Sequence, residues 1–154
     1  MLKLTKSYLI YTTILLSSAC SKKPVIFPIV TMALPNNEES TILIRSSGTG
    51  KNITAAVDDA ERKAFNTLLF YGYPSSVQSR PLIDNKADAI QKNPTYFNDF
   101  FDKKTYKNFI VYSNNFMNEQ KSQNTYYLVR QLKINLRILR TDLENNGIIR
   151  KFGF

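Results

Sequence analysis

The segment Gly48-Thr49-Gly50-Lys51 follows a β-branched run and precedes a helical pattern, which is where phosphate-binding loops stand. A Walker-type loop would need glycine at Arg45 and Ser or Thr at Asn52. A dinucleotide-binding loop would need its third glycine at Ile53. Because both patterns fail, we expect no nucleotide here and expect the two glycines to form a tight turn.

Acidic side chains are the remaining groups suited to acid–base catalysis. The chain has no His and a single Cys, which excludes Ser-His-Asp, Cys-His and His-metal sites and an internal disulfide. Its acidic groupings are explained by helix-dipole compensation and solubility, and they are Asp58/Asp59/Glu61, Asp99/Asp102 and Asp142/Glu144. We therefore expect a protein that is not an enzyme, with no catalytic residue, metal or cofactor.

Aromatic residues are concentrated in one part of the chain. Ten of the nineteen Phe and Tyr residues lie between Tyr96 and Tyr127. Phe97, Phe100 and Phe101 share a helix face at i, i+3 and i+4. Exposed, they would form a platform for a glycan or peptide, whereas such spacing is more often typical of a core.

Basic residues are concentrated toward the end of the sequence. Residues 130–151 hold only Asp142 and Glu144 as acids. The basic residues that could form a partner-binding surface are Arg130, Lys133, Arg137, Arg140, Arg150 and Lys151. An electropositive surface of this kind suits an acidic protein or membrane headgroups, although solvated strand and helix faces are the simpler explanation.

The first nineteen residues have the pattern of a secretory signal peptide. Lys3 and Lys6 precede an apolar stretch from Tyr8 to Leu16, and small residues follow. Leu16-Ser17-Ser18-Ala19-Cys20 resembles the lipobox of bacterial lipoproteins, with the leucine four residues before the cysteine instead of three. The resemblance implies that the Cys20 thiol carries the lipid. Two or more acyl chains would give stable anchoring to the membrane.

Removal of residues 1–19 changes the charge that a partner would meet. The whole chain has a formal charge of +9, and the remaining 135 residues carry 19 basic and 12 acidic groups, a net charge of +7. An exported domain does not meet nucleic acid, so the positive charge favours acidic lipids, glycans or an acidic protein.

Three regions follow from the composition: a signal peptide at 1–19, a lipidated Cys and flexible tether at 20–40, and one domain at 41–154. Pro24, Pro28 and Pro35 would interrupt any helix in the tether. Within the domain we expect strands at Thr41–Ser46, Tyr106–Ser113 and Thr125–Leu136. Residues 114–124 are expected to form a polar turn.

Helical periodicity covers Ile53–Tyr71, with Asn52 as N-cap and Gly72 as the terminating glycine. Further helices are expected within Asp84–Lys92, after Thr95 as a cap, and over Arg137–Asn146. The order β-α-(α)-β-β-α indicates an α+β fold, a small antiparallel sheet with helices packed on one face.

The segment from Arg45 to Gly72, with Ala55, Ala56, Ala60 and Ala64 along its helix, resembles the N-terminal domain of flagellar assembly protein T and related small outer-membrane lipoproteins. This resemblance implies an α+β module of an envelope complex without catalytic residues. The signal segment and the Lys/Asn/Ile-rich composition are similar to Bacteroidetes lipoproteins. In that group acidic residues after the cysteine resemble a surface-export signal, so Lys22-Lys23 favours a periplasm-facing, outer-membrane location.

These observations predict a lipid-anchored envelope protein that acts as a non-catalytic binding or scaffold subunit of an envelope assembly. Its expected partners are the membrane and another envelope protein, with no nucleic acid and no nucleotide. The alternative is a glycan- or peptidoglycan-binding lipoprotein that uses exposed aromatic rings.

Overall fold

The computed structural model describes residues 31–36, 38–117 and 119–151. The expected signal peptide and Cys20 lie outside these described residues. The elements are β1 (Thr31–Leu34), β2 (Thr41–Gly50), α1 (Ile53–Phe70), α2 (Lys86–Lys92), α3 (Pro94–Phe101), the 3-10 helix η1 (Thr105–Phe109), β3 (Ile110–Asn115), β4 (Gln120–Ser122), β5 (Thr125–Asn135) and α4 (Leu136–Asn145).

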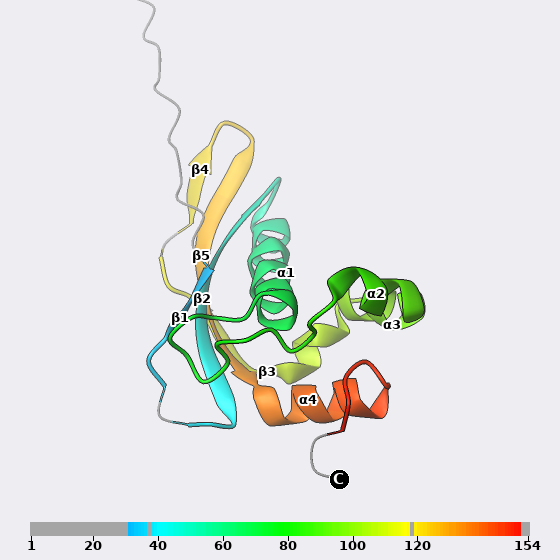
Figure 1. The fold of residues 1–154 in the computed structure, drawn as a ribbon. Coiled ribbons are helices and arrows are strands. Elements are labelled where there is room, and N and C mark those ends of the chain that lie inside the picture. The colour runs from blue at the N-terminus through cyan, green and yellow to red at the C-terminus, as the bar shows by residue number, and fades with distance from the viewer. Residues whose placement is uncertain (1–30, 37, 118, 152–154) are drawn as a thin grey trace, which may run out of the picture.

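The strands form one antiparallel sheet in the order β1-β2-β5-β3, and β4 pairs with the N-terminal end of β5, residues 125–127. Strand β2 pairs with β5 along its whole length, from Thr41 opposite Asn135 to Gly50 opposite Tyr126. The α-helices lie together on one side of this sheet (Figure 1). The predicted α+β fold, with helices on one face of a small antiparallel sheet, is therefore confirmed.

Helix α1 begins at the predicted Ile53 and ends at Phe70, one residue before the predicted Tyr71. The Asn52 side chain accepts a hydrogen bond from the Ala55 backbone N–H at 2.8 Å, which is the contact expected of an N-cap. Gly72 has φ +76°, a left-handed conformation that favours glycine, and its N–H donates to the Thr67 carbonyl at 2.8 Å. These two caps fix the length of the helix that covers the sheet.

The core lies between α1 and the centre of the sheet. Residues that alternate along the two central strands face the helix, and they are Ile42, Ile44, Leu132 and Ile134. The apolar face of α1, which includes Ala64, Phe65 and Leu68, packs against them. Along this part of β5 apolar and polar residues alternate, and Leu132 and Ile134 are both 0 % exposed.

Gly48 and Gly50 do not form the expected turn, because β2 continues through both of them. A Cβ atom at Gly48 would lie 2.0 Å from the Ala56 carbonyl oxygen and 2.5 Å from the Ala60 nitrogen. One at Gly50 would lie 2.5 Å from the Ala56 nitrogen. Glycine at these positions lets α1 approach the strand closely, which is a different use of the residue from a turn.

The region expected to be a tether contains strand β1. Thr31–Leu34 pair with residues 43–46 of β2, and the Ala33 side chain packs against the core. This pairing satisfies the backbone groups along an edge of β2 that would otherwise be open. The part of the chain that the structure describes therefore belongs to the folded domain from Thr31 onward.

Three local predictions in the second half of the chain are wrong. Residues 105–109 form a 3-10 helix instead of the first part of a strand, because Tyr106 and Phe109, three residues apart, both turn into the core. The expected polar turn at 114–124 contains the end of β3 and all of β4. Helix α3 starts at Pro94 with Asn93 as its N-cap, two residues earlier than the predicted Thr95 cap.

Candidate functional site

Helix α4 presents basic side chains near two adjoining surface hollows. The Asn135 side chain caps the helix by accepting a hydrogen bond from the Ile138 N–H at 3.0 Å. Leu136, Leu139 and Leu143 are buried on its inner side. Arg137 is left exposed and Arg140 half-buried beside the core.

The smaller hollow has a volume of about 550 Å³ and is lined by Glu39, Ser40, Val77, Leu136, Arg137 and Arg140. The larger hollow has a volume of about 890 Å³. It lies between residues 80–85, one side of α2 and the turn at 147–150, and Arg140 contributes to its wall. Arg140 is thus common to both hollows, which places Arg80, Arg137 and Arg150 around it.

These four residues, Arg80, Arg137, Arg140 and Arg150, are called the arginine cluster below. None of them forms an ion pair with another described residue. The Arg140 guanidinium donates a hydrogen bond to the neutral Gln78 side chain, and its buried Nε has no partner among the described residues. The cluster therefore keeps its positive charge largely uncompensated.

Acidic residues are few at the hollows. Glu39 lines the smaller one, and Asp84 and Asp88 line the larger one. Asp88 already pairs with Lys92 at 2.9 Å along α2. A carboxylate arriving from outside would therefore meet guanidinium groups without displacing an ion pair of the cluster.

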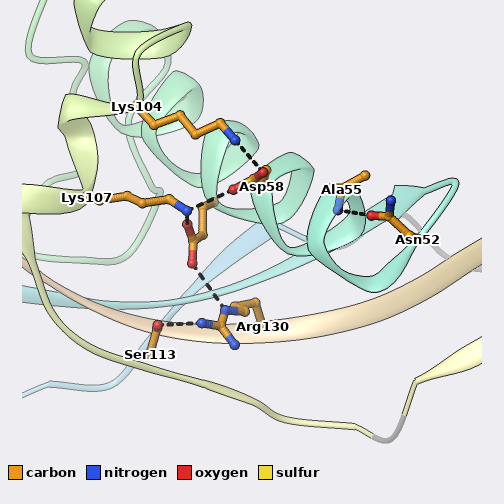
Figure 2. Close-up of polar contacts among 8 residues, drawn as sticks. Asn52, Ala55, Asp58, Lys104, Lys107, Ser113 and Arg130 are labelled. Atoms are coloured by element: carbon orange, nitrogen blue, oxygen red, sulfur yellow. Dashed lines mark hydrogen bonds and ion pairs between the residues drawn. The ribbon is translucent and has the colours of Figure 1, made fainter.

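Arg130 does not belong to this surface, although the sequence grouped it there. It lies on the helix-facing side of β5, and its Nε lies 3.3 Å from Oε1 of the buried Glu61. Its terminal nitrogens donate to Ser113 at 2.7 Å and to Asn115 at 2.8 Å. Figure 2 shows Arg130 held beside Ser113 in this way. Arg130 therefore joins β5 to α1 and β3.

The Arg130 network continues through α1 to η1 and the residue before it. Lys104 and Lys107 lie 2.6 and 2.8 Å from the Asp58 carboxylate, as Figure 2 shows. Lys107 also lies 3.5 Å from Glu61. Burial opposes ionisation of Asp58, but hydrogen bonds from Lys104 and Lys107 outweigh it and hold the pKa of this carboxyl below its usual value. The hydrogen bond to Asp58 raises the pKa of Lys107.

The other two predicted basic residues also lie apart from the hollows. Lys133 points to the face of the sheet opposite α1 and pairs with Glu38 at 2.8 Å. Lys151 is exposed and lines neither hollow. The structure thus brings together Arg137, Arg140 and Arg150 and adds Arg80, which the sequence pattern did not indicate. Arg80 lies sixty residues from Arg140 in the chain, and no local pattern indicates that they meet.

The three phenylalanines of the expected aromatic platform pack into the protein. Phe97 is 5 % exposed and Phe100 is 1 % exposed, while Phe101 is half-buried. The Phe100 ring centroid lies 5.7 Å from Phe65 and 6.0 Å from Phe109. The Arg62 guanidinium lies 5.3 Å from the Phe101 ring. Of the two interpretations of this spacing, the core is confirmed and the exposed platform is wrong, because the shared helix face packs against the core.

Members of each acidic grouping form ion pairs or hydrogen bonds with other side chains. Asp99 and Asp102 pair with Lys103 and Arg62 at 2.8 and 3.2 Å. Asp142 accepts a hydrogen bond from the Tyr96 hydroxyl at 2.7 Å. Among the described residues no group of three or more Cys, Asp or Glu side chains is placed to hold a metal ion.

No family model matches the chain, and comparison with curated proteins and with solved structures also finds no match. Within the ranges that the structure describes, no helix is long and apolar enough to cross a membrane.

Proposed function

We propose that this chain is a lipid-anchored protein of the cell envelope whose domain binds an acidic protein partner through the arginine cluster. In this role it is a non-catalytic scaffold or binding subunit of a larger envelope assembly. The anchor is Cys20, and the domain is the α+β unit that follows it.

The observation that carries the binding role is the uncompensated charge of the arginine cluster. Seven carboxylates of the described residues form ion pairs, and their partners are lysines, Arg62 or Arg130. The four arginines that surround the two hollows take part in none of these pairs. A surface that gathers positive charge in this way favours association with a negatively charged partner.

The proposed anchor would keep the domain close to the membrane. Ten residues, 21–30, separate Cys20 from the first residue of β1. Even fully extended, ten residues span at most about 35 Å. The partner therefore belongs to the same membrane or to the layer immediately beside it.

The anchor has a direct test. Cys20→Ala removes the proposed acceptor thiol, and we expect the protein to move from the membrane fraction to the soluble fraction of disrupted cells. Cys20→Ser is a second variant that lacks the thiol and should behave alike. Membrane retention equal to that of the unchanged protein would refute the anchor.

Partner binding is tested by crosslinking in cells, followed by purification and mass spectrometry. We expect one stoichiometric membrane protein to be recovered, and expect it to be lost when Arg137→Glu and Arg150→Glu are combined. Lys51→Glu is the matched control, because Lys51 is an exposed cation at the opposite end of β2 from Thr41. Recovery of cell-wall fragments without a protein partner would contradict the scaffold role and support the glycan alternative.

A further inference from the structure

The larger hollow has an apolar floor as well as a charged rim. Ile83 and Ala89 form part of the core and are 4 % and 8 % exposed. Leu82, Ile148 and Ile149 are partly buried and pack against the same core. Apolar atoms are therefore within reach of any group that enters the hollow.

The rim of this hollow is dominated by guanidinium groups. Arg80 and Arg150 line it and are exposed, and Arg140 lines it and is half-buried. Lys92 and Asp88 neutralise one another, which leaves Asp84 as the acidic residue opposed to the three arginines. Arginine presents a planar fork that can donate two parallel hydrogen bonds to one carboxylate.

The walls of the hollow are held by the fold itself. The Ile83 N–H donates to the Leu69 carbonyl at 2.8 Å, which ties the 80–85 segment to the end of α1. The Ile148 N–H donates to the Leu143 carbonyl at 2.9 Å, which folds the last turn back on α4. Gln78 is buried and hydrogen-bonds both the Arg80 carbonyl and the Arg140 side chain. A ligand would therefore enter a preformed site, which lowers the entropic cost of binding.

From these features we infer that the larger hollow binds an extended acidic segment of the partner protein, with carboxylates on the arginines and an apolar side chain on the floor. This inference rests on the proposed function and specifies the chemistry of the partner. The volume of the larger hollow, about 890 Å³, lies within the range of roughly 300–1,000 Å³ that is usual for ligand sites.

The shape of the site favours a protein segment over anionic lipid headgroups. The apolar floor lies within a recess, between the 80–85 segment and the turn at 147–150. An extended peptide can place a side chain at that depth, whereas a flat bilayer surface meets mainly the rim. The combination of an apolar floor with a guanidinium rim is thus complementary to alternating acidic and apolar side chains.

The test uses the whole mature chain carrying Cys20→Ala, so that no acyl chain takes part. Fluorescence anisotropy would be measured with a labelled Glu-Glu-Leu-Glu-Glu-Leu peptide and with the same peptide carrying Gln in place of Glu. We expect the acidic peptide to bind with an affinity that falls with added salt, and the neutral peptide to bind at least about tenfold more weakly.

Variants then locate the site. We expect Arg80→Ala combined with Arg150→Ala to weaken acidic-peptide binding about tenfold or more, since each lost charge-assisted contact is worth up to about a factor of ten. Both side chains are exposed, so this variant should fold normally, which circular dichroism would confirm. Ile149→Ser should weaken binding of the Leu-containing peptide but not that of a peptide with Ser in place of Leu. Lys51→Ala is the control and should change nothing.

Three outcomes would overturn the inference: equal binding of the two peptides, no effect of the arginine variant, or no binding of the acidic peptide. Binding to phosphatidylglycerol vesicles that is lost in the arginine variant, without peptide binding, would assign the cluster to lipid headgroups. If the crosslinked partner persists in cells while the peptide fails to bind, the inference is wrong and the scaffold role stands.

Discussion

Replacement of Gly48 by alanine tests how closely α1 packs on the sheet. The added Cβ would lie 2.0 Å from the Ala56 carbonyl oxygen, 2.5 Å from the Ala60 nitrogen and 2.8 Å from the Ala60 Cβ. Two of these three atoms belong to the backbone, so no rotamer change can relieve the clash. The helix must move away from β2, and the core that both elements share must repack.

The expected cost follows from overpacking of a filled core. Such changes typically cost about 1–3 kcal/mol, and a clash with the backbone belongs at the upper end, so we expect about 3 kcal/mol. For a domain of this size that loss corresponds to a fall in Tm of roughly 10 °C. Thermal and urea denaturation, followed by circular dichroism, would measure both quantities.

Gly147→Ala is the matched control for the Gly48→Ala experiment. Gly147 has φ +69°, but a Cβ atom there meets nothing within 4 Å. Alanine at this position therefore carries only the backbone cost of a left-handed conformation, about 1 kcal/mol. If Gly48→Ala were no more destabilising than Gly147→Ala, α1 would not lie against β2 as described, and the reasoning would be refuted.

Two further predictions concern the Arg130 network. Glu61→Gln leaves the partly buried Arg130 without its counter-ion, so we expect the free energy of unfolding to fall by about 3 kcal/mol. The exposed pair of Arg62 and Asp102 is the control, and Asp102→Asn should cost less than about 1 kcal/mol; similar losses in urea unfolding would contradict the burial assigned to Glu61. The second prediction is a pH dependence from Asp58, whose folded pKa is depressed despite its burial because Lys104 and Lys107 stabilise the carboxylate. Its contribution to stability is present above the unfolded Asp pKa of about 4 and is lost as the pH falls below that value. Asp58→Asn should flatten this part of the stability profile, and an unchanged acid slope in the variant would refute the assignment.

The sequence predicted the elements whose signals are local. The boundaries of α1 follow from Asn52 and Gly72, because each residue type meets a specific backbone requirement of a helix end. The buried face of β5 at Leu132 and Ile134 follows from the alternation of apolar and polar residues there. Elements that depend on distant partners were missed: Thr31–Leu34 form a strand because β2 offers an open edge.

The candidate site was predicted only in part, for the same physical reason. Arg130 and Lys133 were grouped with the arginines of α4 because they lie close to them in the sequence. The two residues are three positions apart on β5, so their side chains point to opposite faces of the sheet. Arg80 reaches the site through a long connection whose course depends on tertiary contacts, such as the bond between Ile83 and Leu69. The helical spacing of Phe97 and Phe100 indicated a shared face but not whether that face was exposed.

We propose above that the arginine cluster contacts a protein partner in the cell envelope. The most direct measurement places a photo-crosslinking amino acid at position 137 and, separately, at position 51, and compares the products in living cells. We expect the position 137 variant to give a discrete crosslinked band that contains one membrane protein, and the position 51 variant to give none. The absence of a discrete product at position 137, or the same product at both positions, would contradict this proposal.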